Sequence, residues 1–236
     1  MAQSRLARAH KPKKSQGVYE TLRRRIILGQ LRPAEPIGEM QVASELNCSQ
    51  GPVREALLRL QEDGLVNRLG YRGTIVSAIT QEEISELLLL RKMIETRGVV
   101  YAFDGIDDAA MERLSDLVRQ MENAAADDDE FLLSELDRAF HSELFRYSGL
   151  DALEPILQRC LLHVHRYKIS LSPGDRTLIE TAQGHWPIMQ TLREKGLSEV
   201  KRAITHHIDT VCGGSVSLPS KARVRGRTVT DFHNGS

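Results

Sequence analysis

The sequence has few cysteines and no long apolar run, and each scarcity excludes a class of protein. Three cysteines occur among the 236 residues, at Cys48, Cys160 and Cys212, and this odd, scattered set argues against a disulfide framework and against a clustered zinc site. No apolar stretch approaches the roughly 18 residues of a membrane helix, and the basic N-terminus lacks the apolar segment of a signal peptide. With 41% hydrophobic and 27% charged residues, the composition is that of a globular protein of one or two domains, which we expect in the cytoplasm without membrane contact.

The formal net charge is zero, but the charges are unevenly distributed along the chain. Residues 1–79 contain 13 Lys and Arg against 7 Asp and Glu, residues 80–212 contain 15 against 24, and residues 213–236 contain 4 against 1. A basic first part joined to an acidic second part predicts that the first part meets a polyanion. The alternative is surface charge without a partner.

Residues 17–78 show the pattern of a small helical domain with a hairpin. The expected helices cover residues 18–28, 39–46 and 50–63, and the expected strands cover residues 65–69 and 74–76. Gly29 and Gly64 are placed to end helices, and Ser49 is a candidate N-cap. Two helices joined by a tight turn and followed by a hairpin form a winged helix-turn-helix, whose second helix enters the major groove of DNA.

From Thr80 onward the chain is predicted to be helical throughout. The expected helices cover residues 80–103, 107–126, 130–147, 151–170, 176–195 and 198–212. Short loops between about six helices are typical of a bundle. The predicted fold class is therefore mainly α, with a winged helix-turn-helix at 17–78 and an all-helical bundle at 79–212. Residues 1–16 are expected to form a basic flexible arm, and residues 213–236 a disordered basic tail.

The second helix of the predicted pair and the wing carry residues suited to DNA. The candidate contacts are Ser49, Gln50, Gly51, Arg54, Arg72 and Gly73. The opening turn of the helix offers small polar groups and backbone N–H groups to phosphates, and Arg54 can bind a guanine edge with two hydrogen bonds. Arg72 at the wing tip can reach a minor groove or its phosphates. The alternative for Arg54 is an ion pair with Glu55 or Glu62 on the helix surface.

These residues also carry a family resemblance. The run Leu46-Asn-Cys-Ser-Gln-Gly-Pro-Val-Arg-Glu-Ala-Leu57, with Gly64-Leu-Val66 and Arg72-Gly73, resembles the signature of the GntR family of bacterial transcription regulators. The resemblance implies a DNA-binding winged helix-turn-helix with contacts at the six candidate positions. Met40 stands where family members often carry Arg, and Gln50 stands where they tend to carry Arg or Lys, so fewer cations face the DNA. The arm at residues 5–14 either compensates through phosphates or has no role.

Four polar residues of the predicted bundle lie on apolar helix faces. Asp137 and His141 are four residues apart and share a face with Leu133, Phe140 and Leu144, while His185 and His207 lie on similar apolar faces of two later helices. A buried carboxylate is costly unless it is paired, and three imidazoles sharing a cation would satisfy it. One Asp and three His suit Zn²⁺, Ni²⁺, Mn²⁺ or another first-row divalent ion. The alternative for each His is a hydrogen-bonded core residue.

The same four residues, behind a GntR-type head, resemble the metal-binding pattern of the FCD ligand-binding domain of the FadR subfamily. The resemblance implies a metal with open coordination positions that binds the carboxylate of a small organic acid and relays this event to the head. Pro187 follows His185 closely, so we expect the helix around His185 to kink or to begin there.

Charge supports an anionic effector, because a divalent ion with one Asp and three neutral His leaves a formal positive charge. Arg91 is a candidate ligand for the effector carboxylate, and its alternative is an ion pair with Glu95; Arg166 is a further candidate. The function predicted is a regulator that binds a palindromic DNA operator as a homodimer, since one winged helix reads few bases. The rivals are a metal-dependent enzyme, for which no catalytic general base is evident, and a regulator that senses the metal itself.

Overall fold

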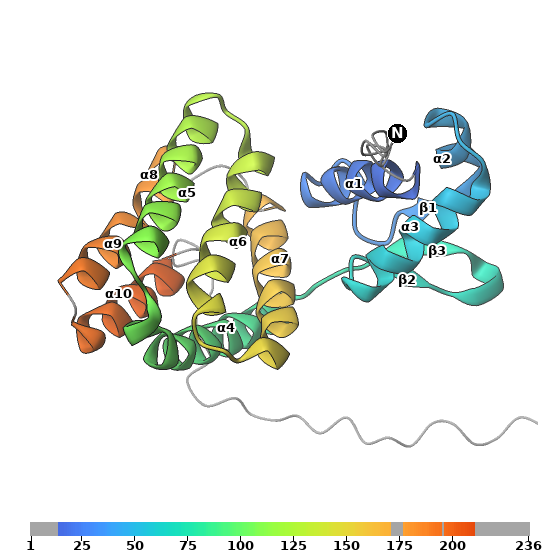
Figure 1. Cartoon of the computed structure of the whole chain (residues 1–236). Helices are drawn as coiled ribbons and strands as arrows, with labels where there is room; N and C mark the ends of the chain where they lie inside the picture. The colour runs from blue at the N-terminus through green and yellow to red at the C-terminus, as the bar shows by residue number, and fades with distance from the viewer. Residues whose placement is uncertain (1–13, 171–176, 195, 211–236) are drawn as a thin grey trace, which may run out of the picture.

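The computed structural model describes residues 14–170, 177–194 and 196–210 (Figure 1). These residues form two parts, which we call the head (residues 14–76) and the body (residues 81–210), joined by a linker at residues 77–80. Most of the predicted arm and all of the predicted tail lie outside the described residues. No helix in the described ranges is both long and apolar enough to cross a bilayer.

The head has the predicted winged helix-turn-helix architecture. Its elements are α1 (Lys14–Ile27), β1 (Pro36–Ile37), α2 (Glu39–Glu45), α3 (Gln50–Glu62), β2 (Val66–Arg68), a 3₁₀ turn (Gly70–Arg72) and β3 (Thr74–Val76). The three strands form an antiparallel sheet in the order β1-β3-β2. Strand β1 is too short to give a periodic signal, and it was not predicted from the sequence.

Helix α1 begins at Lys14, inside the segment predicted as a flexible arm. Ser15 and Val18 are both buried, so the first turn of this helix is part of the head. The core of the head gathers apolar residues from its three helices and its sheet, among them Leu22, Val53, Leu57 and Val76.

The body is all-helical, as predicted, and it contains seven α-helices in the described residues. They are α4 (Gln81–Ala102), α5 (Asp108–Ala126), α6 (Glu130–Arg146), α7 (Glu154–Ser170), α8 (Leu178–Gln183), α9 (Trp186–Arg193) and α10 (Leu197–Thr210), with 3₁₀ turns at Phe103–Gly105 and Asp151–Leu153. The predicted capping box is present, because the Thr80 side chain accepts a hydrogen bond from the Glu83 backbone N–H and the Glu83 carboxylate accepts one from the Thr80 backbone N–H. The Asp107 side chain caps α5 as expected.

The predicted helix at residues 176–195 is divided into α8 and α9. Proline lacks a backbone N–H and clashes with the preceding turn, so Pro187 fits the first turn of a helix and not its interior. His185 consequently stands at the N-cap of α9, and α8 ends before it at Gln183. The break between α8 and α9 therefore sets the position of His185 at the start of α9.

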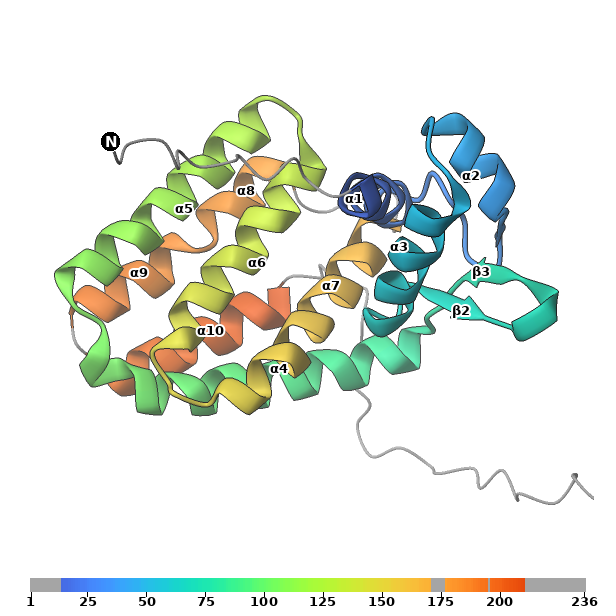
Figure 2. The same ribbon diagram turned by 45° about the vertical axis from the view of Figure 1, so that its right-hand side comes forward.

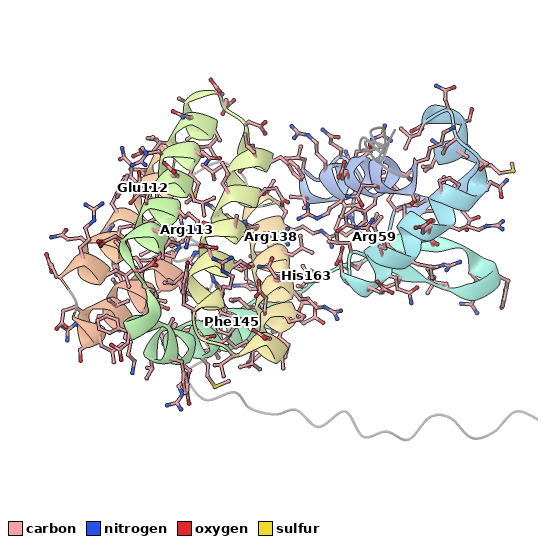
Figure 3. The ribbon with its side chains drawn as sticks, in the orientation of Figure 1. Arg59, Glu112, Arg113, Arg138, Phe145 and His163 are labelled. Atoms are coloured by element: carbon pink, nitrogen blue, oxygen red, sulfur yellow. The ribbon has the colours of Figure 1, made fainter. Side chains whose placement is uncertain are left out.

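Helix α4 runs along the base of the body and packs against α6, α7 and α10 (Figure 1). Gly98 of α4 lies directly under the ring of Phe145 from α6, and a Cβ at this position would overlap the ring. Phe145 is labelled in Figure 3.

The head and the body contact each other through α1 and α7. In the view of Figure 2, α1 lies between the rest of the head and the body. Helix α7 contacts α1, and its Leu162 belongs to the core of the head.

Candidate metal centre

Helices α6 and α10 and the N-cap of α9 bring together the four residues that the sequence singled out. Asp137, His141, His185 and His207 each offer a ligand atom, and these atoms all lie within 4.8 Å of one another. All four side chains are buried, with exposed residue fractions of 2%, 1%, 0% and 3% respectively. Residues separated by up to 70 positions in the sequence therefore converge on one point in the interior.

Hydrogen bonds on the outer Nδ1 atoms hold all three imidazoles with Nε2 facing the centre. The Nδ1 atom of His141 lies 2.6 Å from Glu95 Oε2, that of His185 lies 3.0 Å from the Ala182 carbonyl oxygen, and that of His207 lies 3.3 Å from the Gly184 carbonyl oxygen. Each of these oxygens is an acceptor, so each Nδ1 carries the hydrogen and donates it. The Nε2 atoms of the neutral rings therefore present lone pairs, the form in which imidazole binds a metal.

These lone pairs face one another, and although Arg91 Nη2 lies 2.7 Å from His141 Nε2, the centre has too few hydrogen-bond donors for the other nitrogens. His141 Nε2 lies 3.2 Å from His207 Nε2, and His185 Nε2 lies 3.2 Å from Asp137 Oδ1. Two acceptors do not form a hydrogen bond, and within the described residues His185 Nε2 has no hydrogen-bond partner. A buried polar atom without a partner is costly. Three nitrogen donors and one carboxylate fit a first-row divalent cation, which would satisfy all of them.

The protonation states also suit a metal. Burial would raise the pKa of Asp137, but the neighbouring His165, His185 and His141 hold it well below its usual value, so the carboxylate is ionised. Burial lowers the pKa of His141 and of His207, which keeps both rings neutral near pH 7. Metal ligands must be deprotonated, and Asp137, His141 and His207 already are.

Two residues near the centre have roles that sequence reasoning missed. The sequence predicted Glu95 only as a partner for Arg91, whereas its carboxylate also accepts a hydrogen bond from His141 Nδ1 and so fixes the orientation of that ring. Burial opposes ionisation of Glu95, but His141 and Arg91 lower its pKa to about 2. His165 of α7 lies with its Nε2 atom 2.9 Å from Asp137 Oδ2. A signal for His165 exists in the sequence, because it follows the apolar Leu161 by four residues and so shares a helix face with it.

The two arginines expected to bind an effector are placed differently. Arg91 is fully buried beside the centre; its Nε donates to Glu95 Oε1 at 2.6 Å, and its Nη2 lies 2.7 Å from His141 Nε2. The predicted alternative, an ion pair with Glu95, is therefore present. Arg91 Nη1 has no hydrogen-bond partner among the described residues. Arg166 instead donates to the Ser77 hydroxyl and carbonyl oxygens at 2.9 and 2.5 Å, so its guanidinium binds the linker and is not available to an effector.

A small cavity adjoins the metal centre. It has a volume of about 20 Å³ and is lined by Asp137, His165 and His207 together with Ser134 and Thr181. A water molecule needs roughly 10–15 Å³ of such space, so the cavity has room for one or two waters and not for an organic acid.

The candidate DNA contacts lie at the surface of the head. Ser49, Gly51, Arg54, Arg72 and Gly73 are exposed, and Gln50 is half-buried. Arg54 bonds to neither Glu55 nor Glu62: its Nε donates to Glu39 Oε2 at 2.6 Å and its Nη2 to Gln50 Oε1 at 3.0 Å. The Arg54 side chain remains 59% exposed, so these contacts hold its guanidinium at the surface of the head. Ser49 is the N-cap of α3 as predicted, but its side chain makes no capping hydrogen bond.

Comparisons with known proteins agree with this division into head and body. The family described as bacterial regulatory proteins, gntR family, matches residues 14–76, and the FCD domain family matches residues 86–210. The chain is 27% identical over 203 residues to the HTH-type transcriptional repressor RspR of Escherichia coli, covering 84% of this chain and 86% of that protein. It is 25% identical over 197 residues to the HTH-type transcriptional regulator YdhC of Bacillus subtilis, covering 82% and 87%. The solved structure of E. coli McbR/YncC has the same fold, with a TM-score of 0.69 at 18% identity over 84% of this chain and 94% of that one.

Proposed function

The chain belongs to the GntR family of bacterial regulatory proteins and carries an FCD domain, and from that premise we propose how its two parts work together. It is a DNA-binding transcriptional regulator, and its relatives are regulators and not enzymes. In our proposal the body, of the FadR-subfamily type, holds a divalent metal ion that binds a small organic acid. Binding of the organic acid changes the affinity of the head for a DNA operator. We place the protein in the cytoplasm.

DNA recognition is assigned to the exposed face of α3 and to the wing. Arg54 supplies the contact to a guanine edge, and the N-terminal turn of α3, from Ser49 to Gly51, supplies polar groups to phosphates. Glu39 competes with DNA for Arg54, because the two side chains are paired in the free protein. Arg72 and Gly73 extend from the wing to the adjacent groove.

The metal centre is assigned to Asp137, His141, His185 and His207. The observation that carries this assignment is the inward orientation of three Nε2 lone pairs against one ionised carboxylate; Arg91 Nη2 lies near His141 Nε2, but His185 Nε2 has no hydrogen-bond partner among the described residues. When bound, a divalent ion supplies a Lewis-acidic centre for a carboxylate. The donor set is compatible with Zn²⁺, Ni²⁺ or Mn²⁺.

Local charge supports an anionic effector. The charges of Arg91 and Glu95 offset each other, so a divalent ion with the ionised Asp137 leaves a formal charge of +1. Arg91 Nη1, buried and unpartnered among the described residues, is the group we assign to the effector carboxylate.

The size of the cavity supports a second candidate. A space of about 20 Å³ beside the centre requires the bundle to open before an organic acid enters. A regulator that senses the metal itself needs no such opening. Operator affinity that follows the metal and no organic acid would favour this second candidate.

An exposed apolar stripe on α4 supports a homodimer. Leu89, Met93 and Val100 lie within about 40° of one another on a helix wheel and are exposed. A two-fold axis places the same surface of each copy against the other, so one stripe forms both sides of the interface. Two heads then read the two halves of a palindromic operator.

Elemental analysis and native mass spectrometry of the purified protein test the metal centre. The variant carrying both His185→Ala and His207→Ala should lose co-purified metal, while His206→Ala should keep it. His206 is the matched control because it is adjacent to His207 on α10 but exposed. An equal metal content in all three proteins would reject the site.

A further inference from the structure

Helix α7 contacts the metal centre and the head at adjacent residues. His165 Nε2 lies 2.9 Å from Asp137 Oδ2, and the next residue, Arg166, donates two hydrogen bonds to Ser77. Ser77 directly follows β3 and opens the linker to α4. A single turn of helix therefore spans from a ligand of the proposed metal to the segment that carries the head.

The contact between α7 and the head is buried and made by several residues. The Ser77 hydroxyl accepts from Arg166 and donates to the Gly64 carbonyl oxygen at 2.7 Å, so it ties the end of α3 to α7. His163 Nε2 lies 3.1 Å from the Asp63 carbonyl oxygen, and Figure 3 labels His163 on α7. Ser77, His163 and Arg166 are all buried, which fixes the geometry of the contact.

A second connection runs through α6. Arg23 of α1 makes a bidentate ion pair with Glu135, with both N–O distances at 2.7 Å. Glu135 precedes Asp137 by two residues, so it lies about 200° around the helix from Asp137 and faces the head while Asp137 faces the centre. Helix α6, which contains Asp137, and helix α7, which contacts it through His165, thus both also hold the head.

We propose that α7 couples the metal centre to the head, with His165 positioning Asp137 and Arg166 positioning the linker. This proposal rests on the proposed function, because it assigns the residues through which the body acts on the head. A metal ion that binds Asp137 changes the contact between Asp137 Oδ2 and His165 Nε2 first, because these two atoms are neighbours. Since a packed helix moves as a unit, a displacement at His165 also moves Arg166, and with it Ser77 and the end of α3.

Hydrogen–deuterium exchange of the full chain, with Zn²⁺ and with a chelator, tests the coupling. In the native protein Zn²⁺ should slow exchange in the body at residues 133–145 and also in the head and linker at residues 64–79. Allosteric coupling typically changes an equilibrium about 5- to 150-fold, and the change in exchange at 64–79 should fall in this range. Loss of the response in the body would reject the metal centre itself. A response confined to the body would overturn the coupling and leave the metal centre standing.

Two variants separate the coupling helix from the rest of the fold. Arg166→Met should abolish the Zn²⁺ response at residues 64–79 and keep the response at residues 133–145. Arg113→Met is the matched control, because within the described residues Arg113 bonds to Glu143 and Tyr147 of the body, and it should keep both responses. If Arg166→Met does not fold, Ser77→Ala removes one of the two Arg166 bonds and should reduce the response in the head. A full head response in either folded variant would overturn the proposal.

A third variant tests the positioning role of His165. His165→Leu should weaken Zn²⁺ affinity by about 10- to 100-fold, the usual effect of losing a residue that orients a ligand. His165→Gln retains an N–H donor and should restore most of the affinity. Equal affinities in the two variants would show that the contact between His165 and Asp137 does not act on the metal.

Discussion

Glu95 is the residue whose substitution probes most directly how the metal centre is built. It is buried, it accepts a hydrogen bond from His141 Nδ1, and it pairs with the fully buried Arg91. Glu95→Gln keeps the shape of the side chain and removes its charge. His141 then loses the carboxylate that fixes its tautomer and raises its basicity, so we expect Zn²⁺ affinity to fall by about 10- to 100-fold, or about 1.4 to 2.7 kcal/mol.

The same substitution should destabilise the metal-free protein. Arg91 would keep its charge in the interior without a counterion, and breaking a buried ion pair in this way costs about 3 to 5 kcal/mol. Chemical denaturation measures this loss, and competition with a chelating dye measures Zn²⁺ affinity. Glu86→Gln on the exposed face of α4 is the control and should leave both quantities unchanged.

A double variant separates the two effects. Arg91→Met combined with Glu95→Gln removes both buried charges, so stability should recover toward that of the native protein. Zn²⁺ affinity should stay reduced, because the carboxylate behind His141 is still missing. Native Zn²⁺ affinity in the single variant, or full recovery of affinity in the double variant, would refute the assigned role of Glu95.

Three further predictions concern the head, the packing of the body and the dimer. Arg54→Ala should reduce discrimination between an operator selected from a random library and a random duplex by about 1 to 3 kcal/mol, measured by fluorescence anisotropy at fixed salt; unchanged discrimination would contradict the guanine contact. Gly98→Ala should destabilise the protein by about 1 to 3 kcal/mol in thermal or urea unfolding, because its Cβ overlaps the Phe145 ring. Gly17→Ala, in a helix with open space around the new Cβ, should instead stabilise the protein by about 0.5 to 1 kcal/mol, and the same sign for both substitutions would be inconsistent with the packing described. Met93→Glu should shift the protein from dimer to monomer in analytical ultracentrifugation, and an unchanged sedimentation coefficient would place the interface elsewhere.

Much of the fold could be predicted because its signals are local. The capping box at Thr80 and Glu83, the cap at Asp107 and the stop at Gly64 each depend on a few neighbouring residues, and all three occur in the structure. Pro187 marked the break in the helix around His185 for the same reason. Strand β1 could not be predicted, since two residues give no period and its pairing with β3 joins distant segments.

The roles of the arginines depended on tertiary contacts. Arg54 had two acidic neighbours on its own helix, yet it pairs with Glu39 of α2, because the packing of α2 on α3 decides which carboxylate is nearest. Arg166 had the residue type of an effector ligand, yet the docking of the head on α7 directs it to Ser77.

The sequence by itself determined the class of each part and the four inward-facing residues of the centre, because helix periodicity reports which side chains face the core. It could not determine that three Nε2 atoms and a carboxylate oxygen meet within a few ångströms, nor that His165 and Arg166 join this centre to the head. Those facts depend on how helices distant in the sequence pack together, and side-chain periodicity within one helix contains no information about the helix that lies opposite.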